Sequence, residues 1–149
     1  MSKPNQIDPR GPRFGAAITA TLLAVTVFLA LDASTKDAAF ALLAVVTALF
    51  AVGAIFGVSN HPYAWIFKTL VRPRLSAPQE LEDATPPRFA QGVGLFVALV
   101  GVVFHLSGVE LGLVIAAAAA FVAAFLNAAF NYCLGCQIFL GLKRLKVIR

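Results

Sequence analysis

The sequence predicts an all-α, polytopic membrane protein with four transmembrane helices and an interfacial amphipathic helix in the long middle loop. Hydrophobic residues make up 60% and charged residues 13% of the 149 residues, against about 45–50% and about 25% in soluble domains. A soluble domain of this length could not bury so much apolar surface. In addition, four apolar runs are long enough to cross a hydrocarbon core of about 30 Å, which takes roughly 17–25 helical residues.

The expected spans are residues 14–31, 38–58, 90–109 and 111–140, the last being longer than one crossing requires. They lack the alternation of apolar and polar residues that marks transmembrane β-strands, so we expect helices, which satisfy their own backbone hydrogen bonds in lipid. Residues 1–149 are expected to form a single transmembrane domain.

The net charge of +5 is distributed in a way typical of membrane topology. Lysine and arginine precede the first span, fill the 59–88 loop and follow the last span, whereas the other two connections carry Asp32, Lys36, Asp37 and Glu110. By the positive-inside rule, both termini and the 59–88 loop are expected on the cytoplasmic side of a bacterial inner membrane. The expected partner is therefore the lipid bilayer, and no nucleic acid is expected.

The 59–88 loop has two parts. Residues 62–72 mix aromatic and aliphatic residues with two cations, and Pro62 suits a first helical turn. Such a segment is expected to lie flat in the headgroup region of the bilayer. Residues 75–87 are polar, contain three prolines and are expected to form a solvated linker.

Both histidines and one glycine pattern have alternative interpretations. His61 is either a ligand or proton carrier, or a capping or interfacial histidine, which we favour. His105 is an ionisable group within a span, which suggests a function, but its place near the external end favours a structural role. The small residues from Gly53 to Gly57 form either a homo-oligomer face or, as we favour, a packing face for the protein's own helices.

The candidate site is the pair Cys133 and Cys136, the only cysteines in the chain. Positions three apart on a helix lie on one side, so the pair can form a disulfide. On a reducing cytoplasmic side the cysteines should rest as thiols, and a disulfide would be transient and catalytic. The nearby Lys143 and Arg144 favour a thiolate, whereas apolar burial opposes it.

Three interpretations of the pair remain open. The cysteines exchange electrons or sulfur with a partner, they donate two thiolates to a metal or cluster, or they pack as small apolar residues. A zinc site normally has four ligands, and His61 is the only spare histidine on the same side. No metal or cofactor is therefore expected. Asn131 is expected to support the cysteines or to hydrogen-bond another helix, and Gly135 to let a partner's backbone approach.

The chain resembles the bacterial family of membrane proteins called domain of unknown function 4395. The resemblance rests on Asp8–Phe14, on Pro87–Ala90 and above all on Asn131–Cys136, in which Tyr132, Cys133, Gly135 and Cys136 match the family pattern aromatic-Cys-x-Gly-Cys. It implies thiol redox chemistry or sulfur handling with a thioredoxin-like or sulfurtransferase partner. Some members carry a Cys-Pro pair before the first span, but this chain has no third cysteine.

These observations favour a membrane-embedded thiol–disulfide redox or sulfur-relay protein, with Cys133 or Cys136 as the attacking group. The alternative is a non-enzymatic accessory subunit of a membrane complex, in which the cysteines are structural or bind a metal. Transport is disfavoured because broken spans and buried midplane charges are not evident. The sequence leaves open whether the protein is an enzyme.

Overall fold

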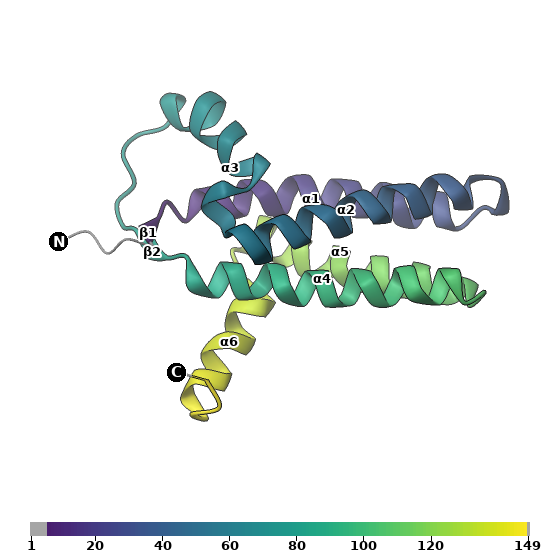
Figure 1. Cartoon of the computed structure of the whole chain (residues 1–149). Helices are drawn as coiled ribbons and strands as arrows, with labels where there is room; N and C mark the ends of the chain where they lie inside the picture. Colours follow the sequence, from purple (N-terminus) through teal and green to yellow (C-terminus); the bar gives the residue numbers. More distant parts are fainter. Residues whose placement is uncertain (1–5, 149) are drawn as a thin grey trace.

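The structure is a computed structural model that describes residues 6–148, and this part of the chain is all-α except for one pair of two-residue strands (Figure 1). The helices are α1 (Arg10–Ala30), α2 (Lys36–Phe56), α3 (Pro62–Ile66), α4 (Thr85–Leu106), α5 (Glu110–Phe130) and α6 (Leu134–Arg144). The strands β1 (Gln6–Ile7) and β2 (Glu82–Asp83) pair antiparallel and join the start of the described chain to the middle loop.

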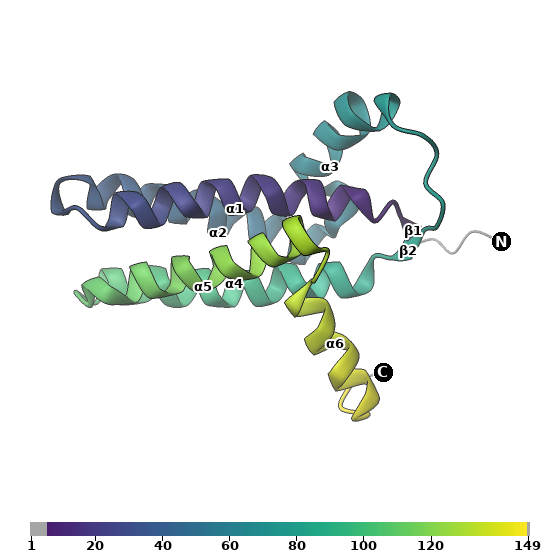
Figure 2. The ribbon, with the colours of Figure 1, turned by 180° about the vertical axis from the view of Figure 1, so that it is seen from behind.

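Helices α1, α2, α4 and α5 form a four-helix bundle in which α1 packs against α2 and α5, and α4 packs against the same two helices (Figures 1 and 2). Each of the four is long and apolar enough to cross a membrane. This confirms the predicted all-α class and its four long apolar helices. The turns α1–α2 and α4–α5 lie at one end of the bundle, whereas α3, α6 and both ends of the described chain, residues 6 and 148, lie at the other (Figure 1).

Small residues dominate the interior of the bundle. Ala39, Ala98 and Ala117 have no exposed surface, and the largest fully buried side chains include Leu23 and Leu43. Large apolar side chains instead point outward, and the exposed ones in or beside the four long helices include Phe28, Leu31, Phe96, Leu106, Leu111 and Ile115. Close packing through small residues, with bulky apolar residues outside, is typical of helices that associate in lipid.

The prediction that the small residues from Gly53 to Gly57 pack within the chain is confirmed at Gly53 of α2 but not at Gly57, which has open space beside it. A Cβ atom on residue 53 would lie 2.7 Å from Cγ of Gln91 in α4. The glycine therefore allows the side chain of Gln91 to pack directly against the α2 backbone.

The two histidines take structural positions. His61 is buried and caps α3: its Nδ1 accepts the Tyr63 amide at 3.2 Å, and its Nε2 lies 2.9 Å from the Leu49 carbonyl. His105 stacks on Phe40 with 4.5 Å between ring centroids. The middle loop also contains helix, because α3 continues through a π-turn, Phe67–Val71, and a 3₁₀ turn, Arg72–Arg74.

The fourth apolar run departs from the prediction of one helix over residues 111–140. Helix α5 ends at Phe130, three non-helical residues follow, and α6 begins at Leu134. Figures 1 and 2 show α6 running steeply away from the long axis of the bundle. The extra length of the run is therefore a separate helix at the end of the bundle.

Candidate functional site

The candidate site begins where α5 stops. Asn131 adopts a left-handed conformation with φ of 54°, which asparagine tolerates better than most residues because its short polar side chain can hydrogen-bond locally. The amide of Asn131 donates to the carbonyl of Asn127, and the amide of Tyr132 donates to that of Leu126, both at 3.1 Å. These bonds satisfy carbonyl groups at the end of α5, and the turn redirects the chain.

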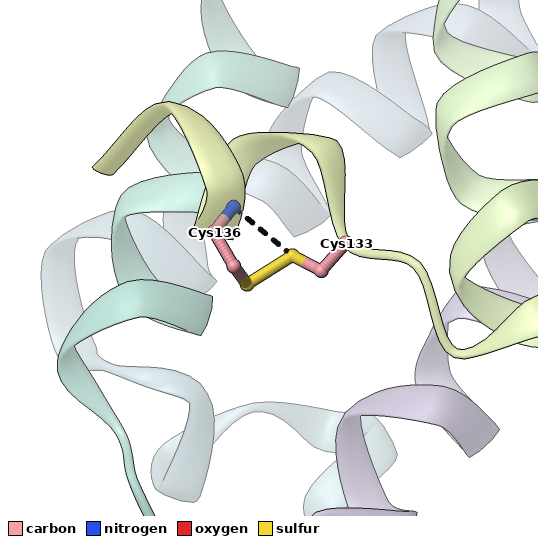
Figure 3. Close-up of a disulfide and its surroundings, with 2 residues drawn as sticks. All are labelled: Cys133 and Cys136. Atoms are coloured by element: carbon pink, nitrogen blue, oxygen red, sulfur yellow. Dashed lines mark hydrogen bonds between the residues drawn. A yellow bond between two sulfur atoms is a disulfide. The ribbon is translucent and has the colours of Figure 1, made fainter. Parts of the chain in front are cut away.

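Cys133 and Cys136 are joined by a disulfide at the first turn of α6 (Figure 3). Their Cα atoms lie 5.1 Å apart. Cys133 is the N-cap residue with extended backbone, and its Sγ accepts a hydrogen bond of 3.2 Å from the amide of Cys136. The sulfur thus occupies the place that a serine or aspartate oxygen takes at many helix starts.

This position differs from the predicted one, in which both cysteines belonged to one continuous helix. Cys133 lies before the helix and Cys136 lies within it, so the sulfur of Cys133 faces the unpaired amides at the N-terminus of α6. Those amides carry partial positive charge, which stabilises a negative sulfur. The start of α6 therefore supplies a hydrogen-bond donor to the sulfur of Cys133 but not to that of Cys136.

Gly135, between the two cysteines, holds α6 against α4. The residue is buried, and a Cβ atom at this position would lie 2.5 Å from Cα of Ala90. Phe89 and Phe139 pack nearby with ring centroids 5.5 Å apart. The sequence interpretation assigned Gly135 to the approach of a partner's backbone, but the space beside it is filled by α4.

Both cysteines are half-buried, whereas Tyr132 before them is 47% exposed. The cations expected to act on the sulfurs are distant, because Lys143 and Arg144 are in the last turn of α6. Lys143 is seven positions after Cys136, which is roughly 10 Å along the helix. Exposed charges at that separation are largely screened at physiological salt. The amide of Cys136, 3.2 Å from Sγ of Cys133, is therefore much closer to the pair than either of these two cations.

The structure brings three of the four predicted site residues together in the first turn of α6, and gives Asn131 the role of ending α5. His61, the only spare ligand in the metal interpretation, uses both ring nitrogens in contacts with its own chain. Within residues 6–148, no three His, Cys, Asp or Glu side chains are grouped so as to hold a metal ion.

Sequence reasoning missed the break between α5 and α6 and the capping role of Cys133. Two signals point to the break, and neither points to the cap. An asparagine at the end of an apolar run can terminate a helix. In addition, Gln137 interrupts the apolar residues between Cys136 and the end of the run at Leu140, and such a polar side chain is unusual within a span.

Comparison with known protein families places the chain in a wider group. A family model described as Domain of unknown function (DUF4395) matches residues 7–144. Neither the curated proteins nor the solved structures contain a match to the chain. Because the family model covers nearly the whole chain, including the cysteine pair, the protein belongs to the DUF4395 family.

Proposed function

We propose that the protein is a multi-pass protein of the cell membrane, crossed by α1, α2, α4 and α5, with both termini and the middle loop in the cytoplasm. The outward-facing apolar side chains of the bundle support insertion into the membrane, because contact between such a large apolar surface and water is unfavourable. Of the lysines and arginines in residues 6–148, all except Lys36 belong to the end that holds α3 and α6. This asymmetry supports the orientation.

In this arrangement α3 and α6 lie at the membrane surface. Figure 1 shows the two helices leaving the bundle on opposite sides at the same end. Helix α6 carries Lys143 and Arg144 in its last turn, while Ile138 and Leu140 are 48% and 40% exposed. A short helix with both exposed apolar residues and terminal cations suits the headgroup region.

At that surface, we propose, Cys133 and Cys136 exchange disulfides with a soluble thiol protein of the thioredoxin-like or sulfurtransferase kind. One observation carries the proposal: the Cys136 amide donates to Sγ of Cys133 at the start of a helix. This contact makes Cys133 a good leaving group and a good nucleophile at neutral pH, because it stabilises the thiolate.

The exchange proceeds in two displacements. A thiolate of a reduced partner attacks Sγ of Cys133, the bond between the two cysteines breaks, and Cys136 leaves as a thiolate that takes up a proton. The second thiol of the partner, after losing its proton, attacks the partner's own sulfur in the mixed disulfide and releases Cys133 as a thiolate. Two electrons pass from the partner dithiol to the pair, and the reverse sequence oxidises it.

A sulfur relay uses the same groups in the reduced state. The Cys133 thiolate attacks the outer sulfur of a partner's persulfide, and the partner's thiolate leaves, so that Cys133 carries the persulfide. Attack by Cys136 on the inner sulfur of Cys133 then closes the disulfide and releases hydrogen sulfide after protonation. The amide of Cys136 stabilises the attacking thiolate of Cys133 in this route also.

Trapping of mixed disulfides tests the exchange. We expect Cys136→Ser to accumulate a disulfide-linked adduct through Cys133 when membranes are mixed with cytoplasmic extract, since the resolving thiol is gone. Cys133→Ser is the matched control and should trap far less. Gel-shift alkylation should also show the wild-type pair cycling between dithiol and disulfide when glutathione is varied. If the wild-type cysteines keep one redox state at all glutathione ratios, and neither variant forms an adduct, disulfide exchange with a partner is excluded.

The second candidate function is a non-enzymatic accessory subunit of a membrane complex, in which the disulfide is structural. It is favoured by the tight contact of Gly135 with Ala90. The disulfide joins the cysteines that lie before and after this glycine, and so holds the first turn of α6 against α4. A structural disulfide would resist glutathione, and its reduction would lower the melting temperature without producing adducts. The trapping experiment therefore separates the two functions.

A further inference from the structure

A cavity of about 310 Å³ lies beside the start of α1 and under the helix that follows His61, and neither cysteine lines it. Val58 and Phe67 contribute to its apolar wall, whereas Lys68 and Arg72 contribute positive charge. Small-molecule sites typically have volumes of about 300–1,000 Å³ and an apolar lining with a few polar groups. The cavity has the size and composition of such a site.

The cavity carries positive charge that the described chain does not neutralise. Asp8, its one lining carboxylate, is already paired with Arg10: Nη2 lies 2.8 Å from Oδ2 and Nε lies 3.0 Å from Oδ1. This hydrogen bonding lowers the pKa of Asp8, with a weaker contribution from Arg72. Neither Lys68 nor Arg72 forms an ion pair with any residue from 6 to 148, and Lys68 makes only a 3.4 Å contact with the Ser59 carbonyl.

The walls of the cavity are held in place by close packing between α1 and α3. A Cβ atom on Gly15 would lie 3.1 Å from Cδ2 of Tyr63, and one on Gly11 would lie 3.5 Å from Cδ1 of Phe67. Burial raises the pKa of Tyr63 and lowers that of His61, so both lining side chains are neutral at physiological pH. The positive potential of Lys68 and Arg72 is therefore not offset by a second negative group in the wall.

We propose that this cavity binds one molecule of an amphiphilic anion, with its phosphate or carboxylate head at Lys68 and Arg72 and its apolar body against Phe67 and Val58. Arginine and lysine are the usual partners of such heads. The cavity belongs to the end of the bundle that meets the headgroup region in the membrane orientation proposed above. The head can belong to an anionic phospholipid or to a free single-chain anion, which share this chemistry.

Native mass spectrometry of the full chain in neutral detergent tests the proposal. The probes are dioleoyl phosphatidylglycerol and decyl phosphate, with dioleoyl phosphatidylcholine and decanol as controls without net charge. We expect one tightly bound equivalent of anionic probe per chain. The double variant Lys68→Gln, Arg72→Gln should weaken its affinity by about tenfold or more, because a charge-assisted contact of this kind exceeds a factor of ten. Arg74→Gln, outside the cavity lining, should bind as the wild type does.

A second variant reports on the cavity without changing its charge. Gly11→Leu places an apolar side chain in the lining, and its Cβ atom would lie at an ordinary contact distance of 3.5 Å from Cδ1 of Phe67. The change also improves helix propensity. It too should weaken binding by about tenfold, with unchanged helical circular dichroism. Binding of phosphatidylglycerol alone identifies a lipid, and binding of decyl phosphate identifies a free anion. Binding of neither, equal binding of the uncharged controls, or unchanged affinity in either cavity variant overturns the proposal.

Discussion

Gly135 in α6 lies so close to Ala90 in α4 that a Cβ atom on residue 135 would come within 2.5 Å of Cα of Ala90. Because backbone atoms of both helices form this contact, no flexible side chain could move aside to make room for a larger residue at position 135. The two cysteines flank this contact, so their position relative to the bundle depends on it. The glycine between the cysteines therefore has a packing role whether or not the pair is redox-active.

The first prediction concerns this contact. Gly135→Val should displace α6 from α4 and destabilise the protein by about 1–3 kcal/mol, the usual cost of overpacking. Thermal unfolding in detergent measures the loss, and faster alkylation of the reduced cysteines should accompany it. Gly141→Ala on the same helix is the control, because a Cβ atom at this position has open space. This substitution should stabilise the helix by about 0.5–1 kcal/mol. Equal stability of Gly135→Val and wild type would contradict the role of the contact.

The second prediction concerns the order of reactivity of the two sulfurs. After reduction, Cys133 should react with iodoacetamide at pH 7 faster than Cys136, because the helix N-terminus and the Cys136 amide favour its thiolate. Peptide mass spectrometry of timed samples measures both rates. Lys143→Gln with Arg144→Gln should leave the rates nearly unchanged, since these cations are at the far end of α6. A slower Cys133, or strong dependence on the two cations, would show that the helix terminus does not control the site.

The third prediction concerns the turn that separates α5 from α6. Asn131→Ala should destabilise the turn by about 1 kcal/mol, because a left-handed backbone costs alanine more than asparagine. Asn131→Gly is the control and should be tolerated. Closure of the disulfide by oxidised glutathione, followed by gel shift, should be slower in the alanine variant only. If both variants close at the wild-type rate, the turn is not needed to present Cys133.

The limits of sequence reasoning are clearest in this same region. Hydrophobicity predicts the four long helices well, because the length of apolar run needed to cross a bilayer is a strong physical constraint. It cannot find the end of α5, since Phe130 and Leu134 on the two sides of the break are both apolar. The break depends on the backbone conformation of Asn131, which hydropathy does not describe.

Sequence spacing identified the two cysteines of the candidate site but not their position relative to the start of α6. The spacing of Cys133 and Cys136 showed that a disulfide was possible, because three residues bring the sulfurs together in a helix and also at its N-cap. The pair was nevertheless expected to rest as thiols, whereas the structure joins it in a disulfide. Spacing alone does not distinguish the two positions, and only the N-cap case gives Cys133 the amide of Cys136 as a partner. Contacts across the fold, such as that of Gly135 with Ala90, leave no pattern along the chain.

The fourth prediction concerns orientation. In a chain carrying Cys133→Ser and Cys136→Ser, a membrane-impermeant maleimide should label Ser107→Cys in intact cells and Ser76→Cys in inverted vesicles. Both positions are exposed, and they lie in the connections at opposite ends of the bundle. The basic residues at the end of α3 and α6 predict this result through the positive-inside rule. The reverse labelling pattern would put the cysteine pair outside the cell and exclude a cytoplasmic partner.

The fifth prediction concerns the pH dependence of stability through His61. Burial lowers the pKa of this ring below its ordinary value of 6.5, although the bond to the Leu49 carbonyl opposes the shift. The unfolded chain therefore binds a proton at a higher pH than the folded chain. The stabilising contribution is fully present above pH 6.5, and it is lost as the pH falls through the folded pKa, with a slope of at most about 1.4 kcal/mol per pH unit.

Thermal unfolding between pH 7 and 5 measures this dependence. Protonation of His61 also removes the Nδ1 acceptor that caps α3, so α3 should loosen first. His61→Asn keeps a side-chain acceptor for the cap but has no titratable group, and its stability should vary less with pH than that of the wild type. His105→Asn is the control and should keep the wild-type dependence, since His61 is intact. A wild type whose stability is constant over this range, or a dependence lost only in His105→Asn, would show that His61 does not carry it.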